Sequence, residues 1–333
     1  MRTSFKNISV IGDGGWGTTL AIHLAKKGLS VTLWSAFAPY AQQMQRTRQN
    51  PKFLAGIPIP RSINITQTLH EAINDCDLIV FATPSQYARE VLSEIKKCNY
   101  AQKPFLSVVK GIDSKKLTRM SQLIHEMLGT VPLAVLSGPT IAIEVAKGSP
   151  STAVIASRNA DLAKKLQRTF NSPAFRIYTN SDMIGVEIGG SIKNIIAIAC
   201  GVCDGLGFGT NTKAAILSRG LAEMARLGEV LGATKHTFFG LSGLGDLATT
   251  CFSPNSRNRQ VGEKLGQGKK IKDILAGMKN VAEGVPTAKA VYQLSRRYRI
   301  AMPITEEVFR VLYKGKDPRN AVTALMCRRL KPE

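Results

Sequence analysis

The sequence predicts an α/β protein in which a doubly wound, mainly parallel sheet is followed by an all-α C-terminal domain. From residue 7 to about residue 180, short apolar runs with strand character alternate with amphipathic helical segments, the pattern of parallel strands joined by helical crossovers. Beyond Asp182, strand-like runs nearly vanish and helical periodicity takes over. We expect one domain over residues 1–185 and a helical domain over residues 186–333, with the boundary inside a helix that starts near Met183.

The first expected strand, residues 8–11, runs directly into a glycine-rich turn and then into a helix. Gly12, Gly14 and Gly17 form a G-x-G-x-x-G pattern, and residues 18–25 have helical periodicity. In such a unit Gly12 allows the tight turn, Gly14 lets a dinucleotide come close, and Gly17 lets helix and strand pack. The N–H groups at the helix start face the phosphates. The segment predicts a Rossmann-type dinucleotide site, with a glycine turn in another kind of strand–helix unit as the alternative.

The remaining elements follow in order along the chain. Six further apolar runs are the other expected strands, several of them apolar throughout, as strands covered on both faces should be. Near the C-terminus, residues 303–312 place apolar side chains on one helical face, and Asp317-Pro318 is typical of an N-cap and the first helical position. The strands are residues 31–34, 78–82, 105–109, 133–136, 153–156 and 175–178, and the apolar helical positions are Ile304, Val308, Val311 and Leu312.

Composition narrows the class of protein. With 333 residues, 44% of them hydrophobic, the chain can bury a full core. We find no apolar signal segment at the start and no stretch approaching the roughly 18 apolar residues of a membrane span, so we expect a cytoplasmic protein without an integral membrane segment. Six scattered cysteines do not resemble a disulfide framework. The one C-x-x-C, Cys200 and Cys203, has no further ligands nearby for zinc, which favours two buried residues on a helix and no metal site.

The formal net charge of the chain, +22, is unusually high. The basic residues are spread along the whole chain, and no run of them is interleaved with aromatic residues, so we expect no nucleic-acid partner. A surface that attracts phosphorylated ligands explains the charge, and a general compositional bias explains it equally well.

Two lysines are candidates for chemistry. Lys110 directly follows an expected strand, where the ligands of open α/β sheets lie, although a solvated loop lysine is the alternative. Lys193, next to Asn194, interrupts an otherwise small and apolar helical segment. Partial desolvation there would lower the lysine pKa toward neutrality and suit it to proton transfer with an alcohol oxygen. The alternative is a lysine whose ammonium reaches solvent at a seam between domains.

The second half adds an acid and a possible phosphate site. Asp246 is a lone acid among the apolar residues of 243–250, and it is a plausible partner for a buried lysine. Ser256 is placed to cap a helix whose first turn holds Arg257 and Asn258, and such a helix start with an arginine binds phosphate well. An ordinary cap followed by solvated basic residues is the alternative.

Windows from nearly the whole chain together resemble the NAD(P)-dependent sn-glycerol-3-phosphate dehydrogenases of the bacterial type. The match is highly specific because so many separate windows agree. They are residues 12–17, 109–111, 136–140, 190–197, 201–209, 243–247, 256–258, 281–284 and 302–307.

The resemblance implies a role for each candidate residue. Lys193 would be the proton donor and acceptor at the C2 oxygen of the substrate. The implied substrate contacts are Lys110, Gly138, Thr140, Lys193 and Asp246, with Ser256, Arg257 and Asn258 at the substrate phosphate. The implied cofactor contacts are Gly12, Gly14, Gly15, Trp16, Gly17, Lys110, Ala142, Arg257, Val281 and Glu283.

The resemblance also implies the reaction. It is reversible hydride transfer between the nicotinamide of NAD or NADP and C2 of dihydroxyacetone phosphate, which gives sn-glycerol 3-phosphate for glycerophospholipid synthesis. In this direction the Lys193 ammonium would polarise the carbonyl and protonate the forming alkoxide, which needs no metal. The expected partners are a small phosphorylated substrate and a second copy of the chain in a homodimer.

The chain departs from the family pattern at the end of the second strand. An acid there binds the ribose 2′-hydroxyl of NAD, and a basic residue accommodates the 2′-phosphate of NADP. The family often carries His or Arg, whereas this chain reads Ser35-Ala36-Phe37, without charge. We expect weaker discrimination in favour of NADPH than in relatives with a basic residue.

Two other functions fit parts of the sequence. A two-domain dehydrogenase acting on a hydroxy acid or a nucleotide sugar would also use a lysine between domains, but it is not expected to carry both residues 243–246 and residues 256–258. Oxidation of a sugar to the acid would also call for a nucleophilic cysteine. A nucleotide sensor without catalysis would not be expected to keep Lys193, Asp246 and Arg257.

Overall fold

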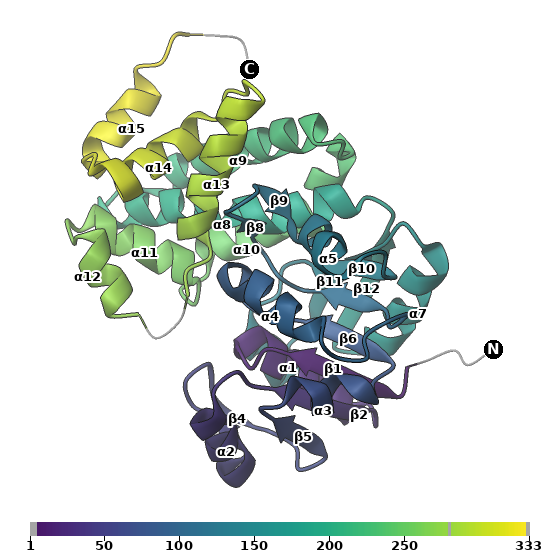
Figure 1. The fold of residues 1–333 in the computed structure, drawn as a ribbon. Helices are drawn as coiled ribbons and strands as arrows, with labels where there is room; N and C mark the ends of the chain where they lie inside the picture. Colours follow the sequence, from purple (N-terminus) through teal and green to yellow (C-terminus); the bar gives the residue numbers. More distant parts are fainter. Residues whose placement is uncertain (1–4, 279–280, 331–333) are drawn as a thin grey trace.

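The computed structural model describes residues 5–278 and 281–330, and within them the largest sheet has eight strands (Figure 1). Neighbouring strands are parallel except for β10 and β11, which run antiparallel. In spatial order the strands are β12 (Phe175–Asn180), β11 (Ser151–Ala156), β10 (Leu133–Ser137), β7 (Phe105–Ser107), β6 (Leu78–Phe81), β1 (Asn7–Ile11), β2 (Ser30–Trp34) and β5 (Ile63–Thr66).

The seven predicted strands are all present, with bounds within two residues of those expected, and the mainly parallel sheet is confirmed. The strand expected over 105–109 ends early, at Ser107, so Lys110 lies three residues beyond it in a loop. The strand β5 is not among the predicted strands, because its sequence, Ile-Asn-Ile-Thr, has two apolar residues and no apolar run. Two small hairpins are also not predicted, and they are formed by β3 (Gln49–Asn50) with β4 (Leu54–Pro58) and by β8 (Ile112–Asp113) with β9 (Thr118–Arg119).

Helices cover both faces of the sheet. Successive strand residues point to opposite faces, so Val10 packs in one apolar cluster and Ile11 in another. The first cluster includes α1 (Gly15–Lys26), α2 (Ala38–Thr47), α6 (Ala142–Lys147) and α7 (Ala160–Phe170), and the second includes α3 (Leu69–Asn74), α4 (Ala88–Ile95) and α5 (Met120–Leu128).

The rest of the described chain is helical and packs around α8 (Met183–Gly205), which contacts both the sheet and the other helices. Figure 1 shows the green and yellow helices of this part above the purple and blue sheet. They are α9 (Thr210–Val230), α10 (Asp246–Phe252), α11 (Arg257–Gly266), α12 (Ile271–Ala276), α13 (Gly284–Arg297), α14 (Pro303–Lys314) and α15 (Pro318–Met326), with short helical turns at Lys235–Phe239 and Leu241–Gly245. A further short helical turn, Ser85–Tyr87, lies between β6 and α4.

The helix signals read from the sequence are confirmed. The four apolar positions expected on one face of α14 are all buried. Asp317 caps α15, its side chain accepting a hydrogen bond from the backbone N–H of Asn320 at 3.1 Å. The expected all-α second half therefore forms from the periodicity and caps that predict it.

Helix α8 corrects one expectation. Its 23 residues are long enough and, with a mean hydropathy of 1.5, apolar enough to cross a membrane, although no such stretch is expected from the sequence. The whole of its apolar window is buried inside the protein, so α8 is the core helix of the helical part. Several glycines along α8 let its neighbours approach: a Cβ on Gly201 would lie 2.0 Å from the carbonyl oxygen of Arg259 in α11.

The strand order reverses next to β1. Strands β2 and β5 lie on one side of β1, and β6 lies on the other, so the carboxyl ends of β1 and β6 border the place where such sheets bind ligands. Gly12 has a φ of +127°, and a Cβ on it would lie 2.8 Å from the carbonyl group of Ala82, the residue after β6. Glycine is therefore needed here for both the turn and the close approach of the two loops.

Candidate active site

The glycine turn between β1 and α1 has the shape expected for a dinucleotide site. A Cβ on Gly17 would lie 2.0 Å from the carbonyl oxygen of Gly12, so glycine lets α1 pack on the turn. Around the Cβ position of Gly14, in contrast, no described atom lies within 4 Å. Gly14 is the N-cap of α1 and no side chain caps this helix, which leaves its first N–H groups available to an anion. These residues fit the pyrophosphate of NAD or NADP.

Gly15, Trp16 and Ala142 border the same turn. A Cβ on Gly15 would lie 3.7 Å from the Cβ of Ala142, the first residue of α6. The Trp16 ring packs edge-on against Phe175, with ring centroids 6.2 Å apart. The indole therefore packs against the sheet, and its Nε1 is buried without a hydrogen-bond partner among the described residues.

A carboxylate between two ammonium groups is the main feature of the site. Asp246, at the start of α10, accepts hydrogen bonds from Lys193 on one oxygen and from Lys110 on the other, the latter at 2.8 Å. The Asp246 side chain is 1% exposed, that of Lys193 7% and that of Lys110 17%. Lys193 also donates to the hydroxyl of Thr250, one turn further along α10, at 2.8 Å. The buried-lysine interpretation of Lys193, with Asp246 as its partner, agrees with this geometry.

We call Lys110, Asp246 and Lys193 the triad. Two groups from the sheet and its loops surround it. Ser137, the last residue of β10, donates to Asp246 at 3.1 Å, and Lys110 donates to the carbonyl oxygen of Gly138 at 3.2 Å. A Cβ on Gly138 would lie 2.8 Å from the Cα of Ala153, so this carbonyl is held close against β11. The loops after β7 and β10 thus meet α8 and α10 at the carboxyl edge of the sheet.

The charges set the protonation of Lys193. Burial lowers its pKa to about 7, with the Lys110 ammonium acting in the same direction and Asp246 opposing both. The two lysines hold the pKa of Asp246 below its ordinary value in spite of its burial. The site therefore holds one firmly ionised carboxylate beside a lysine that exchanges a proton near neutral pH, which is what a general acid and base requires.

A chain of side-chain amides joins the triad to α11 and α13. Asn194 donates to the carbonyl oxygen of Lys110 at 3.3 Å, and Asn258 donates to the amide oxygen of Asn194 at 2.8 Å. The N–H of Gly284, which begins α13, donates to the Asn258 oxygen at 2.9 Å. Asn258 is thus buried in the framework, and its expected place in the first turn of α11 is confirmed.

The start of α11 has the geometry of an anion site. Ser256 caps the helix by accepting from the N–H of Arg259 at 3.3 Å. Arg257 is an exposed residue, although partial burial lowers the pKa of its guanidinium, and it donates no hydrogen bond to another described residue, so its donors are available to a ligand. Its charge lowers the pKa of Glu283, although burial raises that pKa more. Glu283 accepts from the N–H of Ser85 at 3.1 Å and from its hydroxyl.

Two expected contact residues lie apart from the triad. The hydroxyl of Thr140 turns back to the carbonyl oxygen of Gly138 at 3.2 Å. Val281 lies half-buried in the segment before α13, two residues from Glu283. Both are on loops at the same edge of the molecule as the triad and the glycine turn, without direct bonds to Lys193.

No role is predicted from the sequence for Thr250, Ser137 or Ser85. All three form a direct hydrogen bond with a predicted site residue. A signal for Thr250 was available, because residues four apart on a helix share a face and Thr250 follows Asp246 by four. Ser85 pairs with Glu283 across 198 positions, and such a pairing has no local signal.

Cys200 and Cys203 are free and buried on α8, as expected. Among the residues that the structure describes, no group of three or more His, Cys, Asp or Glu side chains is placed to hold a metal ion.

The chain matches known proteins over nearly its whole length. Residues 7–163 match the family model of the NAD-dependent glycerol-3-phosphate dehydrogenase N-terminus, and residues 182–323 match that of the C-terminus. The chain is 47% identical over 329 residues to the glycerol-3-phosphate dehydrogenase [NAD(P)+] of Prosthecochloris aestuarii, covering 98% of this chain and 99% of the relative. It is 47% identical over 331 residues to the enzyme of that name from Geobacter sulfurreducens, with the same coverage.

A solved structure shows the same fold. The crystal structure of glycerol-3-phosphate dehydrogenase from Coxiella burnetii superposes with a TM-score of 0.95 at 38% identity, covering 98% of this chain and all of that one. Both halves of the chain therefore match one family in sequence and in fold. The chain is an NAD(P)-dependent oxidoreductase that belongs to the NAD-dependent glycerol-3-phosphate dehydrogenase family.

Proposed function

We propose that the chain interconverts dihydroxyacetone phosphate and sn-glycerol 3-phosphate, with Lys193 as the proton donor and acceptor. The observation that carries the proposal is the buried Lys193, bonded to Asp246 and beside Lys110, at the carboxyl edge of a dinucleotide-type sheet. The test is oxidation of NADH and NADPH in the presence of dihydroxyacetone phosphate, with dihydroxyacetone as the unphosphorylated control. Turnover that requires the phosphorylated ketone supports the proposal, and no turnover with either cofactor contradicts it.

In the reducing direction the nicotinamide, when bound, supplies the two electrons and the hydrogen that C2 receives. The ammonium of Lys193 donates a hydrogen bond to the carbonyl oxygen, stabilises the negative charge that develops there, and transfers its proton. In the oxidising direction neutral Lys193 accepts the hydroxyl proton. Asp246 holds the lysine in place, and Lys110 keeps its pKa low enough for both directions.

The substrate phosphate is proposed to bind at the start of α11. Arg257 offers donors that no other described residue uses, and the N–H groups of the helix start add to the positive potential. The net charge of +22 favours the approach of such anions. Gly138 and Thr140 would contact the substrate, while Ala142, Val281 and Glu283 would contact the cofactor.

Replacing Arg257 by alanine is expected to raise KM for dihydroxyacetone phosphate about 30-fold, equivalent to about 2 kcal/mol, with a smaller change in kcat. Loss of a charge-assisted hydrogen bond to the phosphate is the cause. Steady-state kinetics measures it, and Arg319→Ala, the same change at an exposed position of α15, is the matched control. An unchanged KM in R257A would show that Arg257 does not bind the substrate phosphate.

Replacing Gly14 by alanine is expected to weaken cofactor binding without loss of stability. The Cβ enters space that no described atom occupies, so the fold tolerates it, but a pyrophosphate at the helix start would meet it. Calorimetric titration with NADH and a thermal melt measure the two effects. Gly28→Ala is not suitable as a control because its φ is +79°, whereas Gly209→Ala, also in open space and with negative φ, is. Unchanged cofactor affinity in G14A would contradict the site.

Several wider expectations remain part of the proposal. They are the division into a dinucleotide-binding domain (residues 1–185) and a helical substrate domain (residues 186–333), a homodimer, a cytoplasmic location, and supply of the product to glycerophospholipid synthesis. For the cofactor, the uncharged Ser35-Ala36-Phe37 supports weaker discrimination in favour of NADPH than in relatives with a basic residue there.

A further inference from the structure

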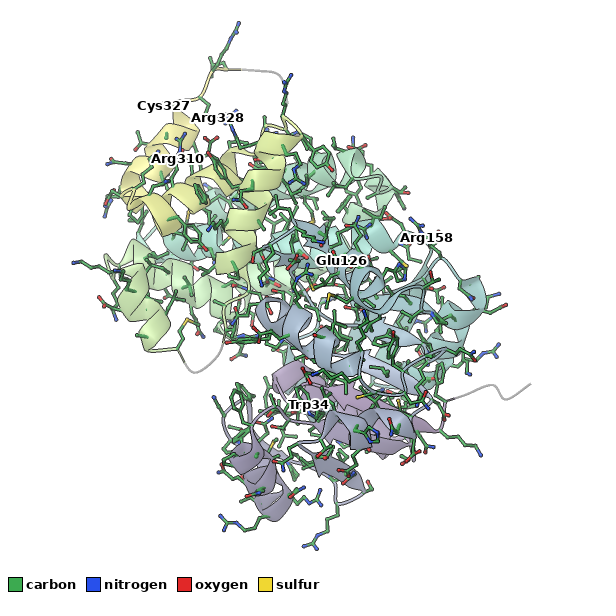
Figure 2. All side chains as sticks on the ribbon, in the orientation of Figure 1. Trp34, Glu126, Arg158, Arg310, Cys327 and Arg328 are labelled. Atoms are coloured by element: carbon green, nitrogen blue, oxygen red, sulfur yellow. The ribbon has the colours of Figure 1, made fainter. Side chains whose placement is uncertain are left out.

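A carboxylate lies at the end of β2 although the strand itself ends without one. Ser35, the first residue after β2, donates its hydroxyl to the carboxylate of Asp13 at 2.7 Å. Trp34, the last residue of this strand, is labelled in the lower part of Figure 2. Asp13 belongs to the glycine turn, between Gly12 and Gly14. A carboxylate from a different loop thus lies beside the end of the second strand, where dinucleotide folds place an acid.

The position of Asp13 is fixed from its backbone. Its carbonyl oxygen accepts from the hydroxyl of Thr18 at 3.0 Å and from the amide of Asn50 at 2.7 Å. Asn50 is fully buried and is itself held by the hydroxyl of Tyr40 at 2.6 Å. The hairpin β3–β4, which the sequence does not predict, therefore supports the glycine turn through Asn50.

The partner of the carboxylate is equally fixed. Ser35 is fully buried, and its N–H donates to the carbonyl oxygen of Thr66 in β5 at 2.9 Å. Among the described residues, Ser35 is the one whose side chain donates a hydrogen bond to the carboxylate of Asp13. Two carboxylate oxygens together accept about four hydrogen bonds, so Asp13 retains the capacity to accept from a ligand hydroxyl.

Burial and the groups near Asp13 act on the pKa of its carboxylate in opposite directions. Burial raises the pKa of Asp13, while the Ser35 hydroxyl and the charge of Lys52 lower it. Lys52 is exposed, and its ammonium lies 5.0 Å from the centre of the Phe53 ring. Lys52 is the residue that would instead favour a 2′-phosphate, but its exposure leaves its charge more screened than that of Asp13.

We propose that Asp13 determines the cofactor preference: its carboxylate accepts a hydrogen bond from the adenosine ribose 2′-hydroxyl and repels a 2′-phosphate, so the chain binds NAD(H) in preference to NADP(H). The inference rests on the proposed dinucleotide site and changes the expectation drawn from the uncharged residues 35–37.

The test is calorimetric titration of the protein with NADH and with NADPH at one fixed ionic strength, without substrate. The wild-type chain is expected to bind NADH at least about tenfold more tightly than NADPH. Asp13→Asn keeps the size of the side chain and an oxygen to accept from Ser35, and it is expected to reduce this ratio at least about tenfold. Asp161→Asn, the same change of charge at an exposed position of α7, should leave the ratio unchanged. Lys52→Met should raise the ratio or leave it unchanged.

The outcomes separate the two levels of the argument. If the ratio of NADH to NADPH affinity is the same in D13N and in the wild type, with both cofactors bound and the melting temperature retained, the role of Asp13 is rejected. The dinucleotide site itself is then still supported. Preference of the wild type for NADPH also rejects the role of Asp13, and loss of that preference in Lys52→Met would assign the selection to Lys52. Failure of the wild-type protein to bind either cofactor rejects the dinucleotide site and this inference with it.

Discussion

Replacing Lys193 by alanine lowers kcat for the reduction of dihydroxyacetone phosphate by about a hundred- to ten-thousand-fold, which is the contribution expected of a positioned general acid. The substrate phosphate is proposed to bind through Arg257, so KM changes much less than kcat. The remaining charges still balance, because Asp246 keeps its hydrogen bond to Lys110 at 2.8 Å. The alanine variant is therefore expected to fold, and steady-state kinetics on the folded variant measures the loss.

Two controls make the Lys193 result specific. Lys193→Met fills most of the volume of the lysine without its amine, so equal losses in the methionine and alanine variants assign the effect to the amine. Added methylamine is expected to restore part of the activity of Lys193→Ala, where the cavity is large enough, and none in Lys193→Met. Full activity in either variant would show that another group transfers the proton.

Replacing Asp246 by asparagine is expected to cost about 3–5 kcal/mol of unfolding free energy, because it leaves two ammonium groups without their shared counter-charge in a buried site. It also removes the one cause that raises the pKa of Lys193, so more of the lysine is neutral at pH 7 and reduction slows. Urea unfolding measures the stability, and kinetics measures the rate.

The pH dependence of that stability follows from the direction of the shift. The folded-state pKa of Asp246 lies below the unfolded value of about 4. The contribution of the carboxylate is therefore fully present above the unfolded pKa and is lost as pH falls through the folded one. The deficit of D246N should narrow in acid, as Asp246 of the wild type becomes protonated. Lys110→Met combined with D246N should recover part of the stability, and equal stability of D246N and wild type would contradict the triad.

How far the sequence predicts the molecule depends on how local each signal is. Strands such as residues 8–11 and 78–82 are apolar runs that any α/β sheet would require, and Ser256 and Asp317 cap helices through bonds to residues three positions away. Short-range physics is enough for these. The strand β5 has four residues, and its place beside β2 is decided by the pairing of Val31 with Ile63, which no local pattern indicates.

In the site, too, some features have a local sequence signal and others depend on contacts between distant residues. Lys193 and Asp246 stand out because each is a charged residue in an apolar segment, and burying one charge requires the other. Their pairing could be expected from this need alone. The bond between Ser35 and Asp13 could not, because both residues are ordinary in turns and the bond depends on the spacing of β1 and β2 and on the bracing by Asn50.

The pH dependence of kcat/KM in both directions tests the role of Lys193 most directly. With the pKa of Lys193 at about 7 in the free enzyme, reduction of dihydroxyacetone phosphate requires the ammonium form, so its kcat/KM should fall as pH rises above 7. Oxidation of sn-glycerol 3-phosphate requires the neutral amine, so its kcat/KM should rise over the same interval. The residual activity of Lys193→Ala should show neither inflection. Identical pH profiles in the two directions, or inflections that survive in Lys193→Ala, would contradict the account.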